Sequence, residues 1–200
     1  MPWQNVSNAG TSSQDPAPFG TALYDEPYGT IARSFPRFLC LSADPLPSTG
    51  VGLYRQLILP GGLTAGAMTA LTASTAKLGG THGWYAITDM NLNVLAVTAD
   101  QTDAATTWGT TYTPQKLPFT APLTTAYTGI YYAAICVTAT TMPNIAGASV
   151  QPGCIGAPPV LAAQFTSAMS APPAVGTQAP AFAAFSVAFT ASLYVTLSVS

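Results

Sequence analysis

Charged side chains are scarce in this sequence and unevenly placed. Asp, Glu, Lys and Arg make up 6% of its 200 residues, whereas an ordinary soluble domain carries about 25%. The 84 residues after Lys116 contain none of them. A free monomer normally depends on surface charge for its solubility, so this scarcity favours a chain that is buried in an assembly or covered by copies of itself. The alternative is a monomer coated with Thr and Ser.

The few charges also argue against some partners. Five Lys and Arg residues and a net charge of −2 cannot build the basic patch that nucleic-acid binding requires. The start of the chain, Met1 to Asn5, lacks the basic and apolar regions of a signal peptide. The uncharged span Ala179 to Val199 is apolar enough to be considered for a membrane helix. From Phe185 onward, however, apolar and small polar residues alternate with a period of two, which predicts a strand instead.

Residues for catalysis or metal binding are nearly absent. His82 is the only histidine, and it lies at a strand entrance without a Gly-x-Ser-x-Gly motif nearby. We interpret it as a structural turn residue. Cys40, Cys136 and Cys154 cannot all pair and do not have zinc-site spacing. We therefore expect no disulfide framework, no metal and no cofactor.

Three carboxylates are the remaining candidates for chemistry. Asp89 lies in a turn sequence, and Asp100 and Asp103 follow a strand. Such residues could serve a glycosidase or hold Ca²⁺, but the spacing of Asp100 and Asp103 does not match an EF-hand. We expect a protein that is not an enzyme.

The stretch from Gly80 to Thr138 contains the clearest strand signals. Its apolar runs are rich in aromatic and β-branched residues and are bounded by Gly, Asn, Asp and Thr. Apolar residues occupy both alternating positions, which predicts burial on both faces. We place a second sheet against one face and a subunit interface against the other. The predicted core includes Trp84, Ile87, Tyr132 and Ile135.

The rest of the chain gives weaker signals. We predict strands at 38–41 and 51–59, a short strand near 160–165, and a strand or a helix at 67–77. The segment 182–199 is predicted as one strand or as two strands separated by a bend. A polar loop is expected between residues 98 and 129, and a connection rich in Pro, Gly, Ala and Ser between 142 and 180. The fold class is therefore all-β: an antiparallel, jelly-roll-like β-sandwich over residues 38–200.

The first 37 residues differ from the remainder and are predicted to form an extended docking arm. They are rich in Asn, Ser, Gly, Pro and Thr, and cannot bury enough surface to fold alone. Single aromatic residues at intervals suit an arm that inserts anchors into pockets of a neighbour. The anchors are Trp3, Phe19, Tyr24, Tyr28 and Phe35. A terminus without a partner is the alternative.

A family resemblance covers residues 38 to 200. It is carried by Leu57–Gly62, Thr81–Ile87, Asp89, Val94–Asp100, Trp108, Pro118–Pro122, Tyr127–Tyr132 and Thr141–Asn144. In these residues the chain resembles a domain of actinobacteriophage virion proteins, of the minor tail, fibre or head-decoration type. The resemblance implies a homotrimeric, jelly-roll-like β-sandwich in a phage particle. Its partners would be copies of itself and other virion proteins, and it would be made in the host cytoplasm.

The function predicted from the sequence is that of a non-enzymatic virion structural protein. Its arm docks on the particle, and its sandwich assembles with other copies. The alternative is a receptor-binding module for host cell-surface glycan, because sugars commonly stack on exposed aromatic rings. Trp108, Tyr112 and Tyr127 are the candidate glycan contacts. Neither role requires nucleic acid or membrane insertion.

Overall fold

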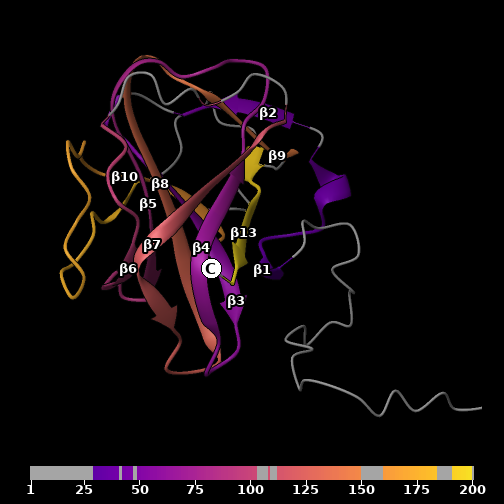
Figure 1. Ribbon diagram of the computed structural model, residues 1–200, viewed down its shortest axis with the longest axis vertical. Coiled ribbons are helices and arrows are strands. Elements are labelled where there is room, and N and C mark those ends of the chain that lie inside the picture. Colours follow the sequence, from indigo (N-terminus) through magenta and orange to yellow (C-terminus); the bar gives the residue numbers. More distant parts are fainter. Residues whose placement is uncertain are drawn as a thin grey trace, which may run out of the picture.

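The protein is an all-β sandwich (Figure 1). This computed structural model describes residues 29–40, 42–46, 49–102, 108, 112–149, 160–183 and 191–199. Every strand pair that it contains is antiparallel. The predicted fold class, an antiparallel β-sandwich, is confirmed.

Two principal sheets and one smaller sheet make up the fold. The four-stranded sheet has the order β1 (Thr30–Arg33), β13 (Val195–Ser198), β4 (Thr64–Leu71) and β7 (Pro114–Thr124). The six-stranded sheet has the order β11 (Phe182–Ala183), β10 (Ala162–Phe165), β3 (Leu53–Leu59), β8 (Gly129–Thr141), β5 (Leu78–Asp89) and β6 (Val94–Val97). The third sheet has the order β12 (Ala191–Leu193), β9 (Asn144–Ser149) and β2 (Ser42–Pro45). A 3-10 helix, η1, spans Arg37–Leu39.

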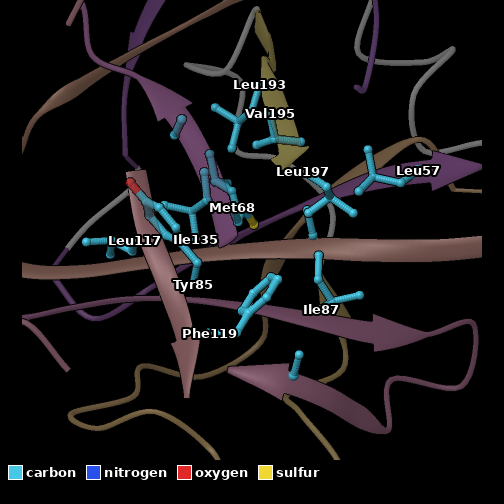
Figure 2. Close-up of a cluster of buried hydrophobic side chains, with 14 of the residues drawn as sticks. Leu57, Met68, Tyr85, Ile87, Leu117, Phe119, Ile135, Leu193, Val195 and Leu197 are labelled. Atoms are coloured by element: carbon cyan, nitrogen blue, oxygen red, sulfur yellow. The ribbon is translucent and has the colours of Figure 1, made fainter. Parts of the chain in front are cut away.

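The main hydrophobic core lies between the two principal sheets. Tyr85 and Ile87 of β5 point into it, and they meet Met68 of β4 and Phe119 of β7 (Figure 2). Tyr85 and Ile87 have no exposed surface. Their chain neighbours Trp84 and Ala86 are also buried, but in a second cluster on the opposite face of the six-stranded sheet. The predicted burial of both faces is therefore observed.

The second face is covered by this chain itself. The segment between β10 and β11 starts near Gly50, where Met169 N–H donates to the Gly50 carbonyl at 2.8 Å. It then crosses the sheet and bonds beside β6, where Val94 N–H donates to the Thr177 carbonyl at 2.8 Å. Met169, Ala179 and Phe182 pack on the second cluster. The sequence interpretation gave this face to a neighbouring subunit, and that assignment is wrong because residues 166–182 already bury it.

Strand β7 lies inside the region predicted as a polar loop. Its 11 residues include Pro114, Pro118 and Pro122. Pro cannot donate to a ladder and is confined to edge strands or bulges. β7 is the last strand of its sheet, and its pairing with β4 is irregular between Ala65 and Ala67. An edge position with an irregular ladder accommodates the prolines.

The predicted arm ends earlier than residue 37. Residues Thr30–Arg33 form β1, which pairs with β13 along the four-stranded sheet. Phe35 packs edge-on against Tyr194, with ring centroids 5.5 Å apart, and lies 5.4 Å below the Arg55 guanidinium. Phe35 therefore packs against its own sandwich. The other predicted anchors, Trp3, Phe19, Tyr24 and Tyr28, lie outside the described residues.

Several smaller predictions have mixed outcomes. The strand expected at 38–41 is wrong, because η1 occupies 37–39 and β2 begins at Ser42. β3 and β10 fall within their predicted ranges, and β4 settles the choice at 67–77 in favour of a strand. β9 was missed within the predicted 142–180 loop. In the described part of the chain, no helix reaches the length and apolarity needed to cross a membrane.

Candidate functional site

The side chains best suited to take part in a reaction lie near the start of β5. His82 Nδ1 lies 2.6 Å from Asp100 Oδ2, and the Gly83 N–H donates to Asp100 Oδ1 at 3.0 Å. His82 is 30% exposed and Asp100 17% exposed. The carboxylate is thus held from two directions, and it fixes the orientation of the only imidazole in the chain.

Lys77 and Trp108 lie behind this pair. Lys77 is 1% exposed, and its Nζ lies 5.8 Å from the centre of the Trp108 ring. A Cβ on Gly80 would come within 2.6 Å of Lys77 Cε, so a side chain at this position would displace the end of the lysine. Trp108 in turn packs edge-on against Tyr85, with centroids 5.8 Å apart. Burial of an ammonium group is expensive unless it is compensated, and the indole face supplies part of that compensation.

The sequence interpretation missed Lys77. It treated this residue only as the end of a weak strand. The available signal was a single lysine, followed by Leu78 and two glycines, in an otherwise apolar and Thr-rich stretch. That pattern does not by itself reveal burial, because the covering residue, Trp108, is 31 positions further along the chain.

In the His82–Asp100 pair the carboxylate orients the imidazole, as the acid of a nucleophilic triad orients its histidine. A complete triad would also need a nucleophile, such as a hydroxyl group hydrogen-bonded to the second ring nitrogen. Thr138 lies opposite His82 in the β5–β8 register, but its hydroxyl is buried and makes no hydrogen bond within the described structure. Among these same residues, no group of three or more His, Cys, Asp or Glu side chains could hold a metal ion. Asp103, which was considered for Ca²⁺, lies outside them.

Asp89 acts as the predicted turn former. Its Oδ1 accepts hydrogen bonds from the N–H groups of Asn91 at 2.8 Å and Asn93 at 2.9 Å. Its Oδ2 accepts one from the Asn93 side-chain amide at 2.8 Å. The carboxylate is fully engaged in shaping the β5–β6 hairpin.

The candidate glycan contacts do not form one site. Trp108 has no exposed surface, so it is unsuitable as a sugar platform. Tyr112 is 50% exposed and Tyr127 is 40% exposed. They flank opposite ends of β7, whose 11 residues span about 35 Å at roughly 3.3 Å per residue. Tyr127 stacks on Tyr131 with centroids 4.9 Å apart and planes at 20°.

The residues predicted for the core are all buried. Trp84 is 1%, Ile87 0%, Tyr132 4% and Ile135 0% exposed. Trp84 stacks on Phe165 at 6.0 Å, and Tyr132 packs edge-on against Phe182 at 4.9 Å. Burial raises the pKa of the Cys136 thiol to about 12, with the Asp100 charge adding to the rise. Cys136 is a free thiol, and Cys154 lies outside the described residues.

An open groove lies on the segment that covers the second face. It has a volume of about 630 Å³ and runs between residues 167–172 and 178–180. No charged side chain lines it, and the Gln178 amide in its wall is already bonded to the Asn91 carbonyl at 3.3 Å. The groove is large enough for a small ligand, but few polar groups in its wall could fix the orientation of that ligand.

Comparison of the chain with protein-family models, with curated proteins and with solved structures finds no match.

Proposed function

We propose that this chain is a non-enzymatic structural protein of a bacteriophage virion, as a minor tail, fibre or capsid-decoration component. The arm docks on the particle, and the sandwich assembles with other copies. The observation that carries the proposal is the resemblance of residues 38–200 to actinobacteriophage virion domains, together with where those residues lie.

The residues of the resemblance occupy scaffold positions. Leu57–Gly62 ends β3 and forms the following turn, Thr81–Ile87 lies in β5, and Pro118–Pro122 lies in β7. Asp89 shapes a hairpin and Trp108 fills the core. A pattern made of strand and turn residues is what a structural module would share with its relatives, and it supports a common fold more strongly than a common role.

The surface supports assembly as well. Several large apolar side chains are exposed, including Ile58 at 54%, Leu78 at 56% and Met90 at 58%. Charged residues make up only 6% of the chain. The homotrimeric state comes from the resemblance alone.

Quantitative mass spectrometry of purified particles of a phage that encodes this protein tests the proposal. Hundreds of copies per particle would indicate a capsid or tube lattice, and a handful would indicate a tail tip. A protein that is expressed during infection but missing from purified particles would contradict the virion role.

The second candidate is a module that binds host cell-surface glycan. The Tyr127 ring, stacked on Tyr131 and exposed at 40%, is the observation that favours it. Binding of the purified protein to isolated host cell walls, weakened at least tenfold by Tyr127→Ala and not by Tyr112→Ala, would support this role. Equal binding by both variants and the parent protein would exclude Tyr127 as the contact.

A further inference from the structure

One segment covers the second hydrophobic cluster, and few of its side chains take part in the cover. Residues 166–181, which we call the strap, leave β10 and return to β11, and they form the orange loop beside β6 and β10 in Figure 1. Most strap residues are exposed, and only Pro173 and Ala179 are buried. The cluster beneath is built largely of rings that pack on one another, such as Tyr54 on Phe165 with centroids 4.7 Å apart. Much of that packing therefore does not depend on the strap.

Backbone hydrogen bonds hold the strap to the rest of the sandwich at its root and at its tip. At the root, the Met169 N–H donates to the Gly50 carbonyl at 2.8 Å. At the tip, the Gly176 N–H donates to the Val94 carbonyl at 2.8 Å, and the Val94 N–H donates to the Thr177 carbonyl at 2.8 Å. These tip residues are exposed apart from Val94, so water competes for the bonds at this end.

The two arms of the strap do not pack on each other. The open groove of about 630 Å³ separates residues 167–172 from residues 178–180. Over the cluster, the Tyr54 hydroxyl donates to the Pro180 carbonyl at 2.6 Å. At the neck, the Thr166 N–H donates to the Ala181 carbonyl at 3.1 Å and holds the two arms together. A segment with a closed neck and no packing between its arms can lift away without disturbing β10 and β11.

We infer that the strap opens about its neck while the sandwich stays folded, and that this opening uncovers the second cluster and the Cys136 thiol. Segments with few buried apolar contacts and exposed backbone hydrogen bonds are the ones that open locally. Cys136 lies under the root, where its Sγ donates to the Gly50 carbonyl at 3.1 Å and lies 3.9 Å from the Met169 carbonyl. The strap also covers β6, the last strand of its sheet. It thus controls access to an apolar face and to a sheet edge, whatever the role of the protein.

Amide hydrogen exchange of the full chain, followed by NMR, tests the opening. The amides of Val94, Gly176 and Ala179, which bond across the tip, should exchange at least about a hundredfold faster than the amides of Trp84–Ile87 in β5, after correction for intrinsic rates. Low urea concentrations should change the strap rates little, because opening exposes far less surface than unfolding does. Equal protection and equal urea dependence in the two groups would overturn the inference, because the strap would then open only when the whole sandwich unfolds.

A disulfide across the tip gives a second test. Asn93 and Gln178 are exposed and directly opposite each other, with backbone hydrogen bonds flanking the pair on both sides. Such pairs have Cα atoms about 4.5 Å apart, which a disulfide can bridge.

The oxidised Asn93→Cys/Gln178→Cys variant should label Cys136 with N-ethylmaleimide at least about tenfold more slowly than the Gln178→Cys control. Peptide mass spectrometry identifies both the bridge and the labelled thiol. Equal rates would show that reagents reach Cys136 without opening of the strap, and would overturn the inference. If the bridge does not form, hydrogen exchange of the parent protein decides.

Discussion

Single aromatic residues support the second face of the six-stranded sheet. Trp84 is 1% exposed and stacks on Phe165. Trp84→Ala should lower the free energy of unfolding by about 3–5 kcal/mol, the usual cost of removing a buried aromatic ring. The indole N–H is buried without a hydrogen bond within the described structure. Trp84→Phe, which removes that donor, should therefore cost clearly less. Urea denaturation of both variants measures this difference, and equal losses would contradict it.

At Leu92 the backbone conformation and the burial of the side chain favour different residue types. It closes the β5–β6 hairpin with φ of 65°, a conformation that favours Gly or Asn, yet it is 7% exposed and packs in the second cluster. Relief of the backbone strain by Leu92→Asn is worth about 1 kcal/mol, whereas loss of a buried leucine costs about 2–5 kcal/mol. The variant should be destabilised by about 1–4 kcal/mol. A higher urea midpoint would show that strain outweighs packing here.

The buried thiol and phenols predict sensitivity to alkali. Burial raises the pKa of Cys136 to about 12 and also raises the pKa values of Tyr54 and Tyr85. The unfolded chain releases these protons at lower pH than the folded chain. Their contribution to stability is therefore complete below about pH 9 and is lost as pH rises toward 12, at about 1.4 kcal/mol per pKa unit.

Unfolding free energies measured from pH 7 to 11 should thus fall steeply above pH 9. Cys136→Ala should show a shallower slope between pH 9 and 10, before the tyrosines contribute. The slopes are compared, because the substitution also changes packing. Identical slopes would mean that the thiol ionises in the folded protein.

At the level of elements, the sequence predicts those strands whose side chains show a clear pattern. β5 and β8 are apolar on both faces, and β3 ends at a Pro-Gly-Gly turn, so each is recognisable locally. β7 alternates exposed and buried residues but contains prolines, and only its edge position reconciles the two. β9 is made of small residues whose strand character comes from pairing with β2 and β12. Such pairing depends on contacts that are remote in sequence.

The two halves of the predicted arm should behave differently on deletion. Removing residues 1–28 should leave the thermal transition within about 2 °C of the parent protein, because this segment is rich in turn-forming residues and has too few apolar side chains to bury much surface. Removing 1–36 also deletes β1 and Phe35, with several backbone hydrogen bonds of about 1 kcal/mol each and an aromatic pair worth about 1 kcal/mol. The midpoint should then fall by about 8 °C or more. Calorimetry measures both midpoints. Equal midpoints for the two deletion variants would show that β1 does not stabilise the sandwich and belongs to the arm.

For the whole molecule, the candidate site was less predictable than the fold. His82 and Asp100 are 18 residues apart in sequence, and Trp108 reaches Lys77 across 31 residues. Periodicity reports which face of a strand is apolar, but it does not report which loop will cover that face. For the same reason, the segment 166–182 was interpreted as a loop and the face beneath it as a subunit interface.

Self-association remains the prediction for the whole protein. The second sheet face no longer supports it, so it now depends on the scarcity of charge and on the exposed apolar residues. Ile58 is 54% exposed and lies opposite the partly buried Ile130 in the β3–β8 register. Light scattering at micromolar concentration should give a mass above that of a single 20.5 kDa chain. Ile58→Lys should shift it toward the monomer, whereas Val175→Lys, at a site 53% exposed on the covering segment, should not. A stable monomer of the parent protein across this concentration range would exclude the assembly role proposed for the sandwich.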